Sequence, residues 1–221
     1  MTTFEEFEAL ITALTAPIND QLPRPWITDL SNPLKAKLFI VGMNQAKGYS
    51  TERLSHSRHL DGLFNRHGES CRGIYAEMTE GSPSPTRKNT DRLRRHLAES
   101  GIADILETNV ICYSTPMSAD LRLARHSGGA ARGSDIFRIL LQHVAPSALI
   151  AHGTGTRNEL SKLLGVSLPM APSSLVEPAP MKVGDMSVFV IPSLAPPQWN
   201  HWQPWSTEYL RAVAKAAART L

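Results

Sequence analysis

The sequence predicts an α/β fold of three layers, α/β/α, with a central sheet of four mostly parallel strands. Four short apolar runs alternate along the chain with segments of helical periodicity, which is the pattern of a parallel sheet covered by helices on both faces. Hydrophobic residues make up 42% of the 221 positions, enough for one sizeable core. No internal repeat or linker interrupts the chain, so we expect one domain over residues 1–221, with residues 1–30 as an N-terminal helix and lead-in.

The elements of the first half follow from local patterns. A helix is predicted at residues 3–14, where apolar side chains recur at helical spacing. A strand follows at residues 37–43, an apolar run that ends at Gly42. Residues 44–88 are polar and too numerous for a single loop, so short helices are expected at residues 58–64 and 73–78.

The second half repeats this alternation. Thr90 is predicted to cap a helix that runs to Ser100, with Gly101 as its stop signal, and Ser134 is predicted to start the next helix. The predicted strands of this half cover residues 105–112, 148–151 and 187–191, and its other helices cover residues 135–144, 153–164 and 205–219.

Composition argues against several classes of protein. No apolar run reaches the ~20 residues of a membrane-spanning helix. The N-terminus is acidic and polar and lacks the pattern of a signal peptide, so a cytoplasmic location is expected. Cys71 and Cys112 are too few for an iron–sulfur cluster or a four-thiolate zinc site, and the histidines show no metal-ligand spacing. We expect no cofactor and no metal.

Two groups of basic residues stand out within a formal net charge of only +3. Several cations on one face are typical of phosphate contact in nucleic-acid complexes, although solvated helix faces explain such groups equally well. The first group is Arg87, Lys88, Arg92, Arg94 and Arg95, and the second is Arg122, Arg125, His126 and Arg132 around a glycine-containing loop.

Unusual loops follow three of the predicted strands. Open parallel sheets bind ligands beyond the carboxyl ends of their strands, so a site is expected in these loops. The chain has Gly-Met-Asn at 42–44, Thr-Asn at 108–109 followed by Thr-Pro at 115–116, and Ile-Pro-Ser at 191–193. In this order, the motifs resemble those of the uracil-DNA glycosylase superfamily, and are closest to its mismatch-specific thymine/uracil and single-strand-selective branches.

The resemblance implies a uracil-DNA glycosylase-like fold and hydrolysis of the N-glycosidic bond of a pyrimidine flipped out of DNA. Such hydrolysis passes through an oxocarbenium-like sugar, so the enzyme must place a water and stabilise charge. Asn44 then holds the water through its side-chain carbonyl. Because an amide is neutral, it is a weak base and slow chemistry is expected. The alternative interpretation of Asn44 is a turn residue after a strand.

Other candidates lie near the same sheet edge. Asn109 is the candidate base reader, since an amide offers both a donor and an acceptor to one Watson–Crick edge; a buried structural amide is the alternative. His152, after the third strand, is a second catalytic candidate, with a structural histidine as the alternative. The remaining base-binding candidates are Gly42, Met43, Gln45, Ala46, Tyr49 and Phe64, and ordinary packing is the alternative for the two aromatic residues.

Four residues are candidates for contact with DNA: Ser193, Leu194, Lys47 and Arg125. Ser193 is expected to bond a phosphate beside the flipped nucleotide. Leu194 is expected to fill the gap left in the base stack. Trp199 and Trp202 are alternatives for that gap, and a rigid packed loop is the competing interpretation of these tryptophans.

The motifs also depart from the family's pattern. Gln45 replaces a proline, and Ile191 replaces the histidine that several branches use to stabilise the departing base, so His152, Asn109 or backbone N–H groups must serve instead. Ala46 stands where the uracil-selective branch has a tyrosine that crowds pyrimidine C5. These departures favour thymine-like, hydroxymethylated or bulkier bases over plain uracil, including modified cytosines of viral DNA, and a role in DNA repair or antiviral defence.

Two rival functions remain open at the level of sequence. One is a DNA-binding module of the same fold that has lost catalysis, and the other is a different small-molecule hydrolase that uses the same sheet edge. A serine nucleophile is disfavoured because Ser193 does not lie in a Gly-x-Ser-x-Gly turn. The expected partner is DNA, with no membrane partner, and the expected state is a monomer.

Overall fold

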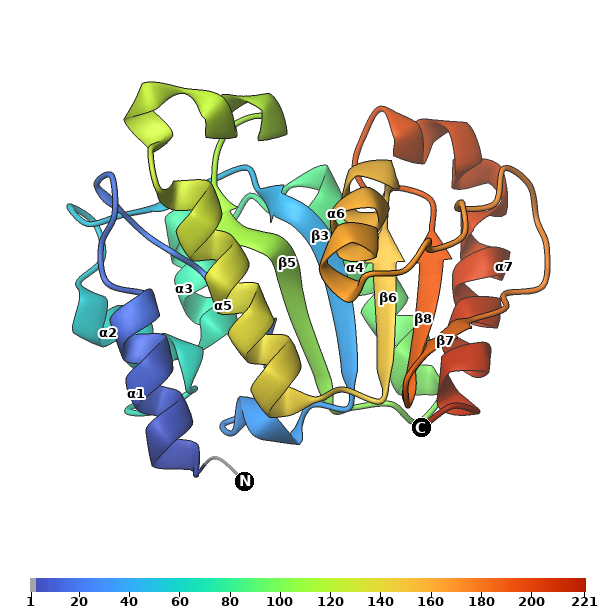
Figure 1. Cartoon of the computed structure of the whole chain (residues 1–221), viewed down its shortest axis with the longest axis horizontal. Coiled ribbons are helices and arrows are strands. Elements are labelled where there is room, and N and C mark those ends of the chain that lie inside the picture. Colours follow the sequence, from blue (N-terminus) through green and yellow to red (C-terminus); the bar gives the residue numbers. More distant parts are fainter. Residues whose placement is uncertain (1–2) are drawn as a thin grey trace.

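A six-stranded sheet forms the centre of the computed structural model, which describes residues 3–221 (Figure 1). Its strand order is β2-β5-β3-β6-β8-β7. The four inner strands are parallel and correspond to the four predicted ones: β5 (Ile105–Ser114), β3 (Leu38–Gln45), β6 (Ala148–His152) and β8 (Met186–Ile191). The edge strands β2 (Ile27–Thr28) and β7 (Met181–Val183) are antiparallel to their neighbours.

The α/β class is confirmed, and the expected number of four strands is wrong. Strands β2 and β7 span two and three residues, too short to show the alternation that predicts a strand. β2 belongs to the stretch expected to be a simple lead-in, and its pairing with β5 attaches that stretch to the main sheet.

Alternate side chains of the central strands enter two separate cores. On β3, Phe39 and Val41 join the core formed with α1 (Phe4–Leu14), α5 (Gly129–Val144) and α6 (Thr154–Leu164). Leu38 and Ile40 join the core formed with α4 (Pro85–Glu99) and α7 (Gln198–Ala218). Helices therefore cover both faces of the sheet, and each buried large apolar side chain contributes about 1.5–3 kcal/mol.

Smaller elements fill the polar stretch and the loops. The short helices α2 (His56–Leu63) and α3 (Cys71–Met78) lie where short helices were expected. Strands β1 (Gln21–Leu22) and β4 (Tyr49–Ser50) form a separate antiparallel pair. Three 3₁₀ turns complete the chain: η1 (Pro33–Lys35), η2 (Ser118–Arg122) and η3 (Ala124–His126).

Three helices begin earlier than the sequence patterns indicated. Helix α4 begins at Pro85 with Ser84 as its N-cap, and Thr90 lies inside the helix and donates to the Thr86 carbonyl. Proline is favoured at the first helical position because it lacks an N–H that would be unpaired there. Helix α5 begins at Gly129 rather than at residue 135, and α7 begins at Gln198 and continues through Pro204.

Two further expectations concern membranes and cysteines. Within residues 3–221, no helix combines the length and the hydropathy needed to cross a bilayer. Cys71 and Cys112 are both buried and unpaired. Burial raises the pKa of the Cys71 thiol to about 12 and that of the Cys112 thiol to about 11, so both stay protonated and unreactive at neutral pH.

Candidate active site

A cavity of about 870 Å³ opens at the carboxyl ends of the parallel strands, between the first turns of α4 and α6. This is where open parallel sheets bind ligands, and the volume lies in the upper part of the range of about 300–1,000 Å³ typical of small-molecule sites. The loops after β3, β5, β6 and β8 all contribute to its lining. The sequence motifs therefore converge on one space.

Gly42, Asn109 and His152 meet on one face of the sheet. Gly42 pairs with Asn109 across β3 and β5. A Cβ atom at Gly42 would lie only 2.7 Å from Asn109 Oδ1 and 3.0 Å from His152 Nε2. The missing side chain thus leaves the gap into which both polar groups project, and a larger residue at position 42 would occupy it.

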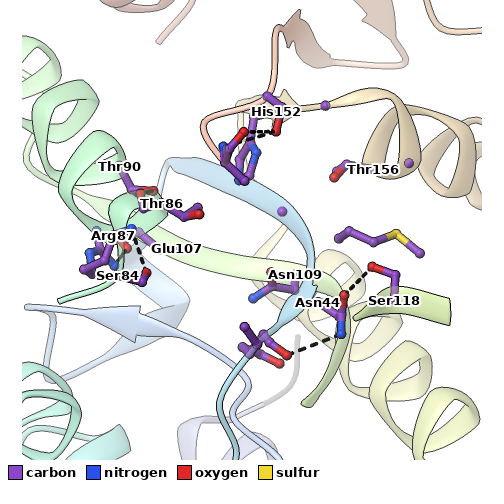
Figure 2. A pocket seen from close by; sticks show the side chains of 18 of the residues that line it. Asn44, Ser84, Thr86, Arg87, Thr90, Glu107, Asn109, Ser118, His152 and Thr156 are labelled. Atoms are coloured by element: carbon purple, nitrogen blue, oxygen red, sulfur yellow. Dashed lines mark hydrogen bonds and ion pairs between the residues drawn. The ribbon is translucent and has the colours of Figure 1, made fainter. Parts of the chain in front are cut away.

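The Asn44 amide is held in a single orientation by two hydroxyl groups (Figure 2). Its Nδ2 donates to Thr115 Oγ1 at 2.8 Å, and its Oδ1 accepts from Ser118 Oγ at 2.7 Å. The Thr115 hydroxyl in turn donates to the Met117 carbonyl at 2.8 Å. A carbonyl oxygen has two lone pairs, so Asn44 Oδ1 retains one acceptor site for a ligand or a water.

Asn109 offers an uncommitted amide. Among residues 3–221, no group makes a hydrogen bond to its side chain, which is half-buried at the cavity wall. An amide without a protein partner can supply its donor and its acceptor together to a ligand. This is the property expected of a base reader.

His152 is neutral at physiological pH. Burial lowers its pKa to about 4. Its Nδ1 accepts the backbone N–H of Leu194 at 3.4 Å, so the proton of the neutral ring resides on Nε2, which projects toward Gly42. His152 therefore acts as a hydrogen-bond donor into the cavity rather than as a general base.

The other predicted site residues divide into two sets. Met43, Gln45, Ala46 and Ser193 line the cavity with the residues above. Tyr49 and Phe64 do not: each is almost fully buried, and Phe64 packs edge-on against Phe4 and Trp26. The structure therefore corrects the expectation that these two rings stack on a ligand, because both faces of each ring are enclosed by protein.

Leu194 also departs from its expected role. Its side chain is fully buried in the core beside α7, and Trp199 and Trp202 pack there with it, their rings 4.8 Å apart. The tryptophans are packed, as the competing interpretation expected, but they lie in the first turns of α7 rather than in a loop. None of the three side chains is exposed for insertion into a base stack.

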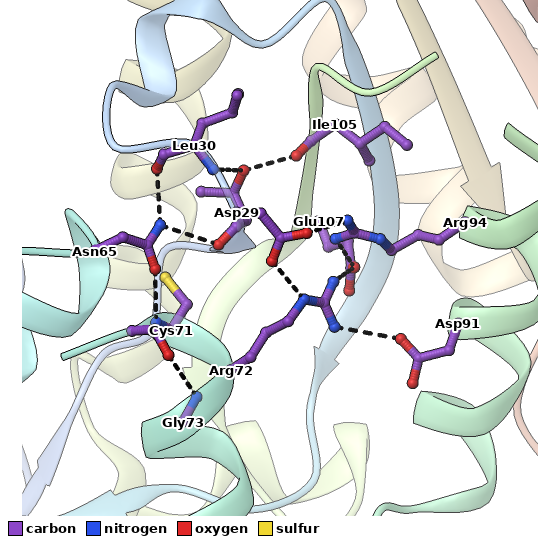
Figure 3. Close-up of polar contacts among 12 residues, drawn as sticks. Asp29, Leu30, Asn65, Cys71, Arg72, Gly73, Asp91, Arg94, Ile105 and Glu107 are labelled. Atoms are coloured by element: carbon purple, nitrogen blue, oxygen red, sulfur yellow. Dashed lines mark hydrogen bonds and ion pairs between the residues drawn. The ribbon is translucent and has the colours of Figure 1, made fainter. Parts of the chain in front are cut away.

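Two members of the first basic group, Arg87 and Arg94, are turned into the protein. Arg72 from α3 and Arg94 from α4 pair with the buried Glu107 (Figure 3). Arg87 pairs with the same carboxylate. Arg92 lies over the Trp199 ring at 5.7 Å. Asp29 and Asp91 complete this ionic cluster. Lys88, Arg92 and Arg95 are exposed without an ion pair in the described chain, so Arg87 and Arg94 are removed from the expected phosphate-binding face and the other three remain on it.

The second basic group remains at the surface beside the cavity. Arg122 and Arg125 are exposed on η2 and η3, and Arg125 donates to His126 at 3.3 Å. Arg132 instead donates to the Leu14 carbonyl at the end of α1. Lys47 is exposed on the loop after β3. The exposed cations of these loops are thus Lys47 after β3 and Arg122 and Arg125 after β5.

Several cavity residues were not among the sequence candidates. Thr115 was quoted only as part of a motif, and Ser118 orients Asn44 from 74 positions away in the sequence. No periodicity or spacing points to such a contact. The other unforeseen lining residues that carry polar groups include Arg24, Ser84, Thr86, Arg87, Thr90 and Glu107.

Similarity to known proteins does not add to this picture. No protein-family model matches the chain, and no curated protein matches it. Within residues 3–221, no group of three or more His, Cys, Asp or Glu side chains is arranged to hold a metal ion. The functional argument therefore rests on the cavity and on the side chains that Asn44, Asn109 and His152 direct into it.

Proposed function

We propose that this protein is a monofunctional DNA glycosylase of the uracil-DNA glycosylase type, acting on a pyrimidine flipped out of the helix. The observation that carries the proposal is the convergence of Asn44, Asn109 and the Nε2 of His152 on one cavity at the sheet edge. Each side chain has a different role: Asn44 holds the water, Asn109 binds the edge of the base, and His152 donates a hydrogen bond to the leaving group.

The reaction follows from these positions. A water accepted at the free lone pair of Asn44 Oδ1 adds its oxygen to sugar C1′ while the bond from C1′ to the base nitrogen breaks. The electron pair of that bond leaves with the base, and the proton lost by the water passes through solvent to the departing base, giving an abasic sugar and the neutral free base. Positioning is the main contribution of Asn44, since a neutral amide accepts protons poorly.

Negative charge develops on the base as it departs. The Nε2–H of His152 is the donor beside Gly42, next to the Oδ1 of Asn109, and the uncommitted Nδ2 of Asn109 is a second donor at the cavity wall. Fixed donors in a site that excludes water stabilise such charge at little reorganisation cost. Because the His152 ring is already neutral, it donates a hydrogen bond without transferring a proton.

Contact with DNA is assigned to the loops around the cavity mouth. Lys47, Arg122 and Arg125 are the exposed cations there, suited to phosphates. Met117, on the cavity rim, is 68% exposed. An exposed apolar side chain at this position is suited to fill the gap left by a flipped base, the role for which Leu194 is too deeply buried.

The direct test is base release. Purified wild-type protein and the Asn44→Ala variant are incubated with duplex and single-stranded DNA that carries uracil, mismatched thymine or 5-hydroxymethylcytosine. Free base is measured by mass spectrometry and abasic sites by alkaline cleavage. We expect release by wild type and a loss of at least about 100-fold in the variant, with the exposed Asn200→Ala as a matched control.

Two other outcomes would overturn the proposal. DNA binding that survives Asn44→Ala, with no base released by either protein, would indicate a non-catalytic binding module. An absence of salt-sensitive DNA affinity would instead indicate a hydrolase for small molecules.

Ala46 provides a prediction about the substrate base. Its small side chain lies exposed in the cavity lining, which leaves room for a substituent on pyrimidine C5. The Ala46→Tyr variant should lose activity on C5-substituted pyrimidines selectively while it retains activity on unsubstituted uracil. Competition between the two substrates in one reaction measures this ratio, and an unchanged ratio would remove Ala46 from the specificity argument.

A further inference from the structure

The cavity extends well beyond the residues assigned to base cleavage. Figure 2 shows Ser84, Thr86, Arg87, Thr90 and Glu107 along one wall, on the far side of Asn109 from Asn44 and Ser118. We call the part bounded by Arg24, Thr86, Arg87, Thr90 and Glu107 the polar lobe. Glu107 precedes Asn109 by two residues on the same face of β5, which places it about 7 Å further along the strand at about 3.3 Å per residue.

The polar lobe contains groups that are not satisfied by the protein. The Nε of Arg87 is buried without a hydrogen-bond partner, and only 9% of that side chain is exposed. No hydrogen bond to the Thr86 hydroxyl exists within residues 3–221. The Thr86 hydroxyl is therefore available to a ligand in the cavity, whereas the Arg87 Nε is closed off from the cavity by the surrounding protein.

The charges of the ionic cluster that forms one wall of the polar lobe are fixed and nearly balanced. Burial alone would raise the pKa of the Glu107 carboxyl, but the charges and hydrogen bonds of Arg87, Arg72 and Arg94 outweigh it and keep the pKa below its ordinary value. The three arginines meet three carboxylates, which belong to Asp29, Asp91 and Glu107. The wall thus presents rigid donors and acceptors with little net charge.

Arg24 adds a flat donor surface. Its guanidinium lies 4.9 Å from the centre of the Tyr49 ring and 5.4 Å from that of Tyr75. Among residues 3–221 it has no carboxylate partner. Held between two rings, it can donate several hydrogen bonds in one plane. Donors and acceptors arranged together in this way are suited to hydroxyl groups, which require both.

We infer that the polar lobe binds a neutral, hydroxyl-rich substituent carried on C5 of the excised pyrimidine, with the size and chemistry of a hexose. This inference rests on the proposed glycosylase function and names its substrate class. A pyrimidine ring held at Gly42 and Asn109 would leave most of the 870 Å³ unfilled, and the unfilled part is the one lined by unpaired donors. A sugar on a hydroxymethyl arm would fill it and bond to them.

The test compares substrates that differ only at C5. Duplexes of one sequence carry uracil, 5-hydroxymethylcytosine, glucosylated 5-hydroxymethylcytosine or 5-carboxylcytosine at the same position, and base release is measured under single-turnover conditions. We expect the glucosylated base to be released at least about tenfold faster than 5-hydroxymethylcytosine, which corresponds to one or two net hydrogen bonds. The Thr86→Val variant removes one hydroxyl without changing shape, and should reduce release of the glucosylated base alone, by about fivefold.

Controls separate this inference from the proposed function. Thr207→Val, on the exposed side of α7, should leave every rate unchanged. Base release at equal rates from all substrates, or fastest from 5-carboxylcytosine, would overturn the polar-lobe inference and leave the glycosylase intact. No release from any substrate would overturn the glycosylase. In that case, equal fluorescence-anisotropy affinities for glucosylated and unglucosylated duplexes would overturn the polar lobe as well.

Discussion

At the scale of single residues, the site depends on a side chain that is absent. Gly42 has ordinary strand geometry and needs no special backbone freedom. Glycine matters at this position because the volume that a side chain would fill stays open. Asn109 Oδ1 and His152 Nε2 both lie within 3.0 Å of where its Cβ would be. This explains why a glycine, which weakens a strand, occupies the centre of the most buried part of the sheet.

Gly42→Ala tests this directly. The added methyl group should displace Asn109 and His152 and reduce base release by about 100-fold, since an error of about 1 Å in positioning costs that much, while the protein stays folded. Single-turnover rates and thermal melting measure the two effects. Gly48→Ala is the control for a clash of equal length away from the cavity lining, because its Cβ would lie 2.7 Å from Gln21 Oε1. Equal rates for both variants would contradict the crowding argument.

Thr115 has an equally local role. Its hydroxyl accepts from Asn44 Nδ2 and so fixes which end of the amide faces the cavity. Thr115→Val keeps the shape and removes that acceptor, and we expect a fall in kcat of about tenfold, equivalent to the ~1.4 kcal/mol of one hydrogen bond, with KM little changed. A rise in KM with unchanged kcat would mean that Thr115 contributes to binding rather than to orientation.

At the scale of elements, the ionic cluster joins α3 and α4 to the central strand β5. Glu107 on β5 receives Arg72 from α3 and both Arg87 and Arg94 from α4. This arrangement fixes the first turn of α4 at the cavity wall, where Thr86 and Arg87 line the cavity. Two arginines of the first basic group thus serve inside the protein, because Arg87 and Arg94 pair with the buried Glu107.

Glu107→Gln should show how much the ionic cluster contributes to the free energy of unfolding. Removal of the buried carboxylate leaves three guanidinium groups without their shared partner, and such losses typically cost about 3–5 kcal/mol in the free energy of unfolding. Urea denaturation at neutral pH measures the change. Asp135→Asn breaks the exposed pair with Arg138 and should alter stability little. Equal effects of the two variants would show that the cluster contributes no more than a surface pair.

At the scale of the whole molecule, the stability of the fold depends on two histidines, His59 and His152, whose side chains are neutral in the folded state. Burial lowers the pKa of both His59 and His152 to about 4, from an ordinary value of 6.5. Between these pH values the unfolded chain binds more protons than the folded one, so the free energy of unfolding rises with pH in that window. The stabilisation is complete above pH 6.5 and is lost as pH falls toward 4.

The prediction is therefore a melting temperature that declines as pH is lowered from 6.5 toward 4, recorded by calorimetry in buffers of constant ionic strength. The His152→Asn and His59→Gln variants should each flatten the decline, because asparagine and glutamine do not titrate in this range. A decline of the same steepness in both variants would assign the pH dependence to other groups, such as the buried carboxylates.

The sequence alone determined the class of fold, the four inner strands and the loops that form the site. These follow from local signals: apolar runs predict buried strands, and a parallel sheet brings its carboxyl ends together, so Asn44, Asn109 and His152 could be assigned to one edge. Helix starts at Pro85, Gly129 and Gln198 escaped prediction because packing against the sheet extends helices past weak local signals.

Only the tertiary structure decided which polar and aromatic residues face the cavity. Tyr49, Phe64 and Leu194 share motifs or loops with site residues, yet each side chain points into a core. Arg87 and Arg94 resemble surface cations in the sequence, yet they meet Glu107 inside the fold. Ser118 reaches Asn44 across a large sequence separation. Spacing along the chain fixes only which residues share an element. The direction and the partner of each side chain depend on how the elements pack against one another.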